Sequence, residues 1–94
     1  MRKYELMSIF PLDEEKSGQG KEAVRQILTS FGADIEKEEL FADRDLAYEV
    51  KKQRRGRFIL FTIKINPDKI SEVEKEFKIT QNLLKYLFVK LEEK

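Results

Sequence analysis

The sequence predicts a protein of the α+β class, in which helices cover one face of an antiparallel sheet. Three observations lead to this prediction. Segments near the start, in the middle and at the end of the chain alternate apolar and polar residues with the two-residue period of a β-strand. Two further segments repeat apolar residues every three or four positions, which is typical of an amphipathic helix. Strands separate these helical segments, so the same sheet has to cover both apolar stripes.

Length and composition favour one soluble domain, which we expect to span residues 1–94. Lys and Arg number 19 against 18 Asp and Glu, so the net charge is +1 and only the charge distribution can indicate a partner. The chain has no cysteine and no histidine, which excludes disulfides, Cys- or His-based metal sites and a histidine base. It shows neither a signal-peptide pattern nor a run of about 20 apolar residues. We therefore expect a soluble intracellular protein without a cofactor, a metal or a membrane partner.

The first third of the chain predicts a strand, a loop and a helix. Residues 2–10 carry apolar side chains on both faces, which fits a central strand, and Pro11 ends the run. Residues 12–20 contain two glycines, which disfavour a helix interior, so we expect a loop or a frayed turn there. A helix is predicted from Lys21, and Gly32 is placed to cap its end. The apolar stripe of this helix is Val24, Ile27, Leu28 and Phe31.

The middle of the chain predicts two strands joined by a basic turn. Residues 34–50 are expected to form one long strand with a bend or bulge near 42–44 and a regular second half. One face of that second half is expected to hold Leu46, Tyr48 and Val50. The turn covers residues 51–57. Residues 58–65 form the strongest strand in the chain, because every second residue is apolar.

The last third predicts a capped helix and a closing strand. Asn66 is expected to cap a helix that runs to about Lys78, with Pro67 at its first position. Residues 86–91 alternate and form the last strand. The resulting order is βαββαβ, which is that of the ferredoxin-like two-layer sandwich. This fold has a four-stranded antiparallel sheet, two helices on one face, and the first and third strands in the centre.

The other face of the sheet is expected to stay open. Periodicity alone does not fix which set of strand side chains the helices cover. If they cover the opposite set, the open face is lined by some of Tyr4, Leu6, Tyr48, Phe58, Leu60, Tyr86 and Phe88.

Catalytic chemistry is poorly supported by the residues present. Acidic residues at 36–39 and 72–76 are interpreted as a solvated strand edge and an exposed helix face rather than as general acid–base pairs. The serine and threonine hydroxyls have no histidine to activate them. Gly18-Gln19-Gly20-Lys21 matches neither the P-loop nor the dinucleotide fingerprint, so we interpret it as a flexible loop.

The basic turn is the strongest candidate for a binding function. Its cations are Lys51, Lys52, Arg54, Arg55 and Arg57. They form either a solvated loop that keeps a sheet edge soluble, or a set of contacts to RNA phosphates with salt-dependent, largely sequence-independent affinity. A second basic area could form where the first and last strands lie side by side, unless its side chains only extend to water at strand ends. That area would contain Arg2, Lys3, Lys85 and Lys90.

The strand after the turn does not carry the base-stacking pair of an RNA-recognition motif. Arg55-Gly56-Arg57-Phe58 lacks one residue after the glycine and the first aromatic residue of the consensus. Phe58 and Phe61 are three positions apart, so they face opposite sides of the sheet. The turn is therefore expected to contact phosphates rather than to read bases.

Several short segments match one family pattern, in order and at the right spacing. They are Met1-Arg2-Lys3-Tyr4-Glu5; Phe31-Gly32-Ala33; Asp45-Leu46-Ala47-Tyr48 with Val50 and Lys51-Lys52; Gly56 with Phe58; Asn66-Pro67-Asp68; and Asn82, Leu84, Tyr86, Val89 and Lys90. Each segment is weakly specific alone, but the set is fairly specific. On these residues the chain resembles the bacterial small-subunit ribosomal protein six family over nearly its full length.

Three positions depart from that family pattern. Ala42 stands in place of a glycine and Glu49 in place of a proline, and both changes are expected to alter the bend in the second strand. Lys85 stands in place of an arginine, which keeps the charge but loses the bidentate geometry of a forked phosphate contact.

The resemblance implies a ferredoxin-like fold, no enzymatic activity, and a cytoplasmic, ribosome-bound protein that helps to assemble the central domain of the small subunit. It also implies ribosomal protein eighteen as the partner with which family members bind small-subunit ribosomal RNA, and no small-molecule substrate. Carried onto this chain, the RNA-binding candidates are Arg2, Lys51, Lys52, Arg54, Arg55, Arg57, Lys85 and Lys90. The partner-binding candidates are Leu46, Tyr48 and Tyr86, although ordinary sheet packing explains Leu46 and Tyr48 equally well.

Two other functions remain open on the residues. A ferredoxin-like module unrelated to ribosomes could sense a small molecule or bind a protein through its sheet, and an enzyme of the acylphosphatase type could use the same fold. A sensing domain would be stabilised by its metabolite. An assembly component would instead bind ribosomal RNA more tightly when its protein partner is present, and more weakly at high salt.

Overall fold

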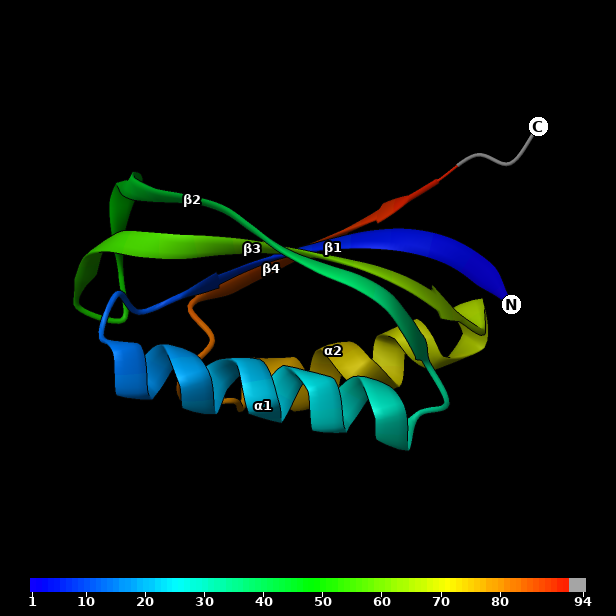
Figure 1. Cartoon of the computed structure of the whole chain (residues 1–94). Helices are drawn as coiled ribbons and strands as arrows, with labels where there is room; N and C mark the ends of the chain where they lie inside the picture. Colours follow the sequence, from blue (N-terminus) through cyan, green and yellow to red (C-terminus); the bar gives the residue numbers. More distant parts are fainter. Residues whose placement is uncertain (92–94) are drawn as a thin grey trace.

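The computed structural model describes residues 1–91 and consists of four strands and two α-helices in that range. The strands are β1 (Arg2–Phe10), β2 (Asp34–Val50), β3 (Gln53–Ile65) and β4 (Lys85–Lys90). The helices are α1 (Glu14–Ser30) and α2 (Ile70–Lys78), and a 3-10 turn, η1 (Pro67–Lys69), precedes α2. Neighbouring strands are antiparallel in the order β2-β3-β1-β4, and both helices lie along one face of the sheet (Figure 1). The predicted ferredoxin-like fold, with β1 and β3 in the centre, is confirmed.

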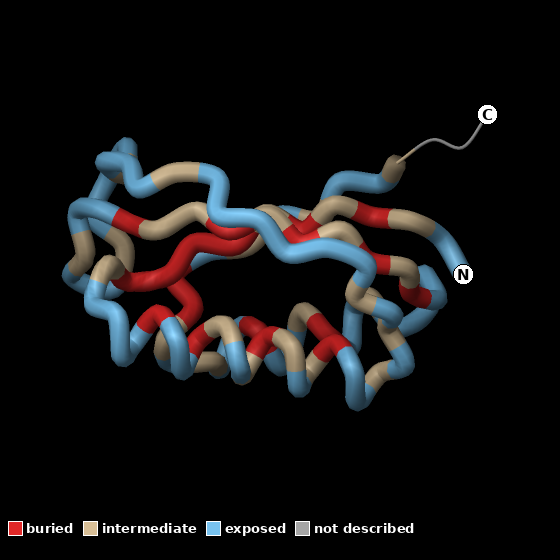
Figure 2. The backbone as a smooth tube through the Cα atoms, viewed as in Figure 1, coloured by how far each residue is buried: buried red, intermediate tan, exposed pale blue. Residues whose placement is uncertain are grey.

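The core lies between the helices and the covered face of the sheet, where Figure 2 shows buried segments of the strands opposite those of the helices. Side chains of a strand alternate between its two faces, so every second residue of β3 points into this layer. The helices contribute their apolar stripes. Core residues that are at most 3% exposed include Leu6, Phe10, Val24, Leu28, Ile59, Phe61, Ile63, Ile65, Val73 and Phe77.

The face of the sheet away from the helices is open, and its lining differs in part from the set considered from the sequence. Four of those side chains lie on the covered face, in the core or packed against it: Tyr4, Leu6, Tyr86 and Phe88. Phe58 and Leu60 lie on the open face, because they alternate with buried residues of β3. The register explains the difference. Leu6 lies opposite Phe61 of β3 and Phe88 of β4, and directly opposed side chains of antiparallel strands point to the same side.

α1 begins at Glu14, so the loop expected over residues 12–20 is wrong: the helix runs through both of the glycines there. Asp13 caps it, because its side chain accepts a hydrogen bond from a backbone N–H of the first turn. Gly20 lies so close to Phe10 that an added Cβ would be 2.6 Å from the ring. Close packing of the helix against the end of β1 therefore compensates for the low helix propensity of glycine.

The turn between β2 and β3 is shorter than the sequence predicted. It consists of Lys51 and Lys52, which both have positive φ (48° and 67°), as in the two-residue type I′ turns of β-hairpins. The three arginines of the predicted turn therefore lie on β3 instead of in a loop. Gly56 is also a strand residue. A Cβ at this position would collide with Ile9 of β1, so the glycine permits the close approach of the two side chains.

β2 pairs with β3 from Asp34 to Asp45 and again at Val50, with three shifts of register. One lies at Glu36, one at Phe41, and one between Asp45 and Val50. A bulge beside the expected site at 42–44 is thus present, but the half of the strand expected to be regular is the least regular part. Extra residues in one strand bend it and re-aim its side chains. Figure 1 shows this end of β2 rising from the sheet before it descends into the turn.

The other predicted helix ends are confirmed. Gly32 has a φ of 81°, and the backbone N–H groups of Gly32 and Ala33 close the end of α1 by donating to the carbonyls of Thr29 and Leu28. Asn66 caps the 3-10 turn that leads into α2, where its side chain accepts from a backbone N–H.

Candidate nucleic-acid and protein interface

The open face of the sheet carries an apolar surface, which we call the open-face patch. It consists of Met7 of β1, Phe58 and Leu60 of β3, and Leu87 and Val89 of β4. Leu87 and Val89 are 61% and 45% exposed. A hollow of about 300 Å³ lies between Met7, Phe58 and Leu87. Adjacent apolar side chains with this much exposure are typical of an interaction surface.

The irregular end of β2 lies over one end of the open-face patch. Leu46 and Tyr48 line a hollow of about 140 Å³ together with Phe58 and Lys85. The Lys85 ammonium lies 4.5 Å from the centroid of the Tyr48 ring and also donates a hydrogen bond to the tyrosine hydroxyl. Leu46 is half-buried, whereas Tyr48 is 61% exposed. Two of the three candidate partner-binding residues therefore border the patch, and Lys85 holds one of them in place.

Tyr86, the third candidate for partner binding, lies on the covered face. Its ring meets that of Phe77 in α2 edge-on, at a centroid distance of 5.3 Å. Burial raises the pKa of its hydroxyl, and the negative charge of Glu74 adds to this effect. The main contacts of this ring are therefore with α2 rather than with the open face.

Two of the candidate phosphate-binding arginines are engaged in ion pairs. Arg57 donates to Asp43 of β2 and to Glu14 of α1, each at 3.0 Å, and its side chain is 19% exposed. These hydrogen bonds, the one to Asp43 first, raise the pKa of Arg57. Arg55 pairs with Asp45 at 2.9 Å. Both arginines support the pairing of β2 with β3, so contact with a phosphate would require the exchange of an existing ion pair.

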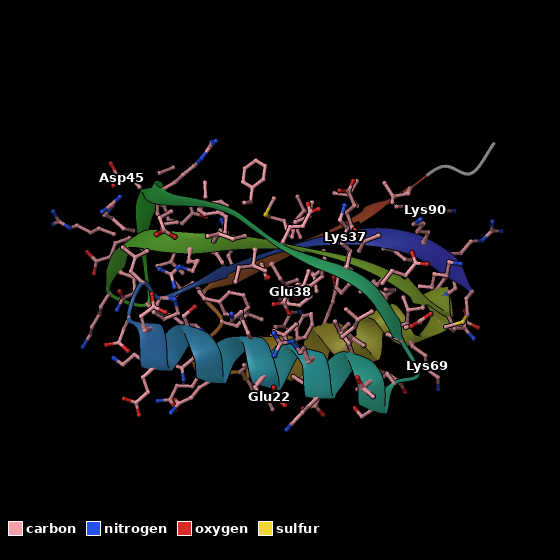
Figure 3. The ribbon with its side chains drawn as sticks, viewed as in Figure 1. Glu22, Lys37, Glu38, Asp45, Lys69 and Lys90 are labelled. Carbon is pink, nitrogen blue, oxygen red and sulfur yellow. The ribbon has the colours of Figure 1, made fainter. Side chains whose placement is uncertain are left out.

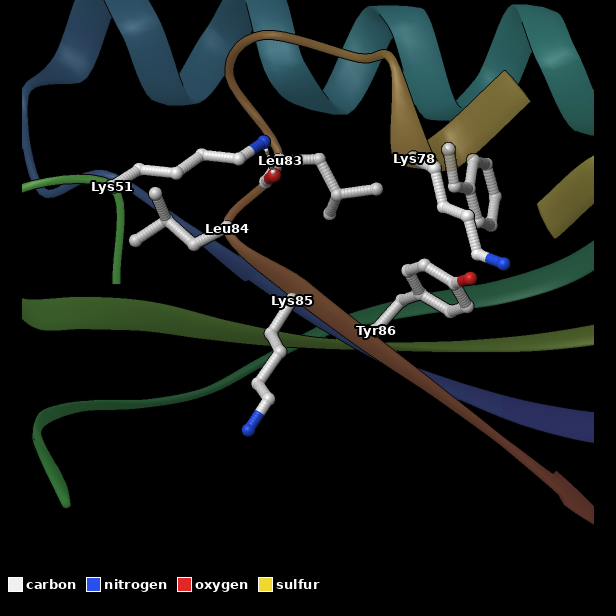
Figure 4. Close-up of a pocket in the computed structure, with 7 residues that line it drawn as sticks. Lys51, Lys78, Leu83, Leu84, Lys85 and Tyr86 are labelled. Carbon is white, nitrogen blue, oxygen red and sulfur yellow. Dashed lines mark hydrogen bonds between the residues drawn. The ribbon is translucent and has the colours of Figure 1, made fainter. Parts of the chain in front are cut away.

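Lys51 reaches from the turn to the segment between α2 and β4. Its ammonium donates hydrogen bonds to the carbonyl oxygens of Leu83 (2.8 Å) and Thr80 (3.1 Å). Figure 4 shows this contact with Leu83, and it shows the Lys85 side chain pointing away from it. Lys51 thus ties the hairpin to the segment before β4, and Lys85 ties β4 to Tyr48 of the hairpin. These two lysines position the hairpin, and neither ammonium is free.

The other candidate cations of the hairpin are accessible. Lys52 is exposed and, within residues 1–91, forms no ion pair. The Arg54 side chain is 88% exposed and approaches Glu49 only to 3.9 Å. Surface pairs of this kind contribute little to stability. Both cations are therefore available to a phosphate at no structural cost.

Arg2 and Lys90 lie at the other end of the sheet, on the paired strands β1 and β4. Both are exposed, and neither forms an ion pair with another residue that the structure describes. Lys3 beside them is paired with Glu36 at 3.3 Å. Figure 3 labels Lys90 at one end of the molecule and Asp45 at the other, along a long axis of 36 Å. The accessible cations among the RNA-binding candidates therefore form two groups instead of one patch.

Several exposed residues near these groups were not predicted from the sequence to be binding residues. They are Leu40, Phe41, Arg44, Leu87 and Val89. Leu87 and Val89 could have been found, because they alternate with Tyr86 and Phe88 and one of the two sets had to be exposed. Phe41 could not, because the sequence indicates a bend or bulge only near 42–44 and does not show that Phe41 is the extra residue.

In the part of the chain that the structure describes, no group of three or more acidic side chains is arranged so that it could hold a metal ion. None of the helices there combines the length and the apolar character needed to cross a membrane.

Comparisons with known proteins point to one family. The family model described as "Ribosomal protein S6" matches residues 3–90. Small ribosomal subunit protein bS6 of Treponema denticola is 50% identical over 93 residues, which cover 99% of this chain and 100% of that protein. The protein of the same name from Treponema pallidum is 40% identical over 92 residues, covering 98% and 99% of the two chains. The structure of 30S ribosomal protein S6 from Thermotoga maritima matches with a TM-score of 0.82 and 25% identity, over 96% of this chain and 87% of that one.

Proposed function

The chain belongs to the ribosomal protein S6 family, and we propose that it binds small-subunit ribosomal RNA jointly with ribosomal protein eighteen, as a non-catalytic assembly component. Membership of the family makes it a protein of the small ribosomal subunit. The RNA contacts, the protein partner and the cytoplasmic assembly role go beyond family membership, and they form the proposal. The observation that carries it is the open-face patch, which has accessible cations at both ends of its sheet.

The protein partner docks on the open-face patch in this proposal. Leu87 and Val89 expose apolar surface that a partner would remove from water, and burial of such surface contributes about 25 cal/mol per Å². Tyr48 adds an aromatic ring at the rim, already oriented by Lys85, and tyrosine is a frequent anchor of protein interfaces. Leu46 lines the hollow beside this rim.

The RNA phosphates are contacted by the two groups of accessible cations. One group contains Lys52 and Arg54 at the hairpin, and the other contains Arg2 and Lys90 at the far end of β1 and β4. The remaining candidate cations, Lys51, Arg55, Arg57 and Lys85, hold the hairpin in the shape that presents the first group. Each phosphate contact makes the slope of log affinity against log salt more negative, by about 0.9 on B-form DNA and about 0.7 on a single strand.

Joint binding follows from the charge of the chain. A net charge of +1 gives little long-range attraction to RNA. A more basic partner on the open-face patch would supply the missing positive charge and would cover the exposed apolar surface at the same time. The two binding events are therefore expected to reinforce each other.

A substitution in the open-face patch tests the docking surface. Leu87→Glu places a carboxylate in the proposed interface, on a side chain whose exposure lets the free protein fold normally. We expect the affinity for ribosomal protein eighteen to fall by more than about tenfold, because an unpaired charge would be buried in the complex. Isothermal titration calorimetry of the two purified proteins measures the change.

Ile79→Glu is the matched control for this experiment. Ile79 is 79% exposed and follows α2, on the helix side of the molecule. This variant should bind the partner with wild-type affinity. If Leu87→Glu also binds with wild-type affinity, the partner docks elsewhere and the proposed surface is wrong.

A further inference from the structure

Phe41 is an exposed aromatic residue on the outer strand of the sheet. Leu40 lies opposite Ile59 and Ala42 lies opposite Phe58, so Phe41 is the extra residue of a bulge. The residue therefore belongs to neither side of the regular alternation, and 53% of it is exposed. Neither the core nor the open-face patch accounts for a large ring at this position.

Arg44 lies over the ring of Phe41. Its guanidinium carbon is 5.3 Å from the ring centroid, within the range of a cation–π contact. The neighbouring carboxylates are engaged elsewhere, since Asp43 accepts from Arg57 and Asp45 pairs with Arg55. Among residues 1–91 no ion pair involves Arg44. The ring is thus capped by a planar cation whose charge is not neutralised.

We propose that Phe41 and Arg44 form a stacking site for one unpaired base of the bound RNA, an inference that rests on the proposed RNA-binding function. Unpaired RNA bases are recognised by stacking on aromatic rings and on arginine guanidinium planes, and both groups are exposed together here. Every base has a π face, so the site tolerates any base. Its uncompensated positive charge favours a polyanion over an apolar protein partner. Lys52 and Arg54 lie further along the same hairpin, toward the turn and beyond the Arg44–Gly56 pair, where they could contact other phosphates of the same RNA.

Affinity measurements on position 41 test this site. The probe is a small-subunit ribosomal RNA transcript, bound by the full chain in the presence of ribosomal protein eighteen. Phe41→Ala and Phe41→Leu should each weaken RNA binding by roughly 5- to 150-fold, the range for loss of one stacked base. The dependence of affinity on salt should stay unchanged, because no phosphate contact is removed. Leu40→Ala, at an apolar neighbour that is 66% exposed, should bind like the wild type.

Fluorescence gives a direct readout of stacking. The chain has no tryptophan, so Phe41→Trp introduces a single fluorescent reporter. The emission of the wild-type complex gives the fluorescence of the partner, which is subtracted. The added tryptophan should be quenched when the transcript binds, because the indole stacks on a base. Ile79→Trp, on the helix side, should keep its emission.

Three results would overturn the stacking site. Wild-type affinity in Phe41→Leu would show that only apolar bulk is needed. If Phe41→Ala binds ribosomal protein eighteen more weakly than the wild type does in the absence of RNA, Phe41 anchors a protein. An unquenched Phe41→Trp in the RNA complex would show that no base reaches the ring. Failure of the wild-type chain to bind the transcript at all is a separate result, and it would remove the proposed function together with this site.

Discussion

Lys51 and Lys52 are neighbours of the same residue type, yet their ammonium groups have different surroundings. Lys51 donates to two carbonyl oxygens and anchors the turn, whereas Lys52 remains exposed without an ion pair in the described chain. In the amino-acid composition the two residues are equivalent basic residues. Only the fold separates them, because the acceptors of Lys51 come from the distant segment before β4. A count of basic residues therefore overstates how many can reach RNA.

Gly18 and Gly20 provide a matched test of how α1 packs. A Cβ at Gly20 would lie 2.6 Å from the Phe10 ring and closer still to the Asn82 carbonyl, whereas nothing lies within 4 Å of one at Gly18. Gly20→Ala should therefore destabilise the protein by about 1–3 kcal/mol, because overpacking outweighs the gain in helix propensity. Gly18→Ala should stabilise it by about 0.5–1 kcal/mol, the difference in helix propensity.

Urea unfolding followed by far-ultraviolet circular dichroism measures both changes in the free energy of unfolding. The two variants should move the midpoint in opposite directions, with no change in the slope. A Gly20→Ala protein that is as stable as the wild type would mean that α1 can shift away from Phe10 at no cost.

At the scale of the element, β2 departs most from what its sequence predicts. The strand is at the edge of the sheet, and its residues are mostly exposed. Ion pairs take the place of apolar packing. Arg25 of α1 donates two hydrogen bonds of 2.8 Å to Glu38, and Glu36 contacts Lys3 at 3.3 Å and Lys64 at 3.5 Å. Periodicity identifies elements whose apolar residues face a core, so it could identify β1, β3 and α2. In β2 it indicated one interruption near 42–44, but not the three shifts of register.

These ion pairs make the attachment of β2 sensitive to acid. The hydrogen bond from Lys3, followed by the charges of Lys3 and Lys64, lowers the pKa of Glu36 below its ordinary value of 4.5. A lowered pKa in the folded state stabilises the protein above pH 4.5, and this contribution is lost as the pH falls through the lowered value. Glu36→Gln should therefore be less stable than the wild type at neutral pH, and the difference should close as the pH falls below the folded pKa.

Thermal unfolding of both proteins from pH 7 to pH 2 checks this expectation. Added salt at neutral pH provides an independent control, since screening should narrow the difference between two proteins that differ in an exposed ion pair. A difference in Tm that persists undiminished at pH 2 would show that Glu36 acts through packing rather than through its charge.

At the scale of the whole molecule, the fold was predictable and the interface only partly so. Six periodic segments in the order βαββαβ leave few arrangements once crossovers are right-handed, and the ferredoxin-like sheet is one of them. The covered face was not predictable, because β1 and β4 are apolar on both sides and only the register with β3 decides between them. The accessible cations were not predictable either, because Arg57 finds its partners on β2 and α1, far away in the sequence.

The whole molecule therefore presents an apolar open face with small groups of accessible cations at opposite ends of a 36 Å axis. Neither feature is strong alone. A net charge of +1 cannot supply much affinity for RNA, and only two residues of the open-face patch, Leu87 and Val89, are exposed. We therefore expect the protein partner and the RNA to be bound together.

The most direct test is the affinity of the full chain for a small-subunit ribosomal RNA transcript, measured with and without ribosomal protein eighteen across a salt series. We expect ribosomal protein eighteen to raise the affinity by at least about tenfold, equivalent to about 1.4 kcal/mol of coupling. The affinity of the complex should also fall linearly on a plot of log affinity against log salt. Equal affinity with and without the partner, at every salt concentration, would contradict joint binding.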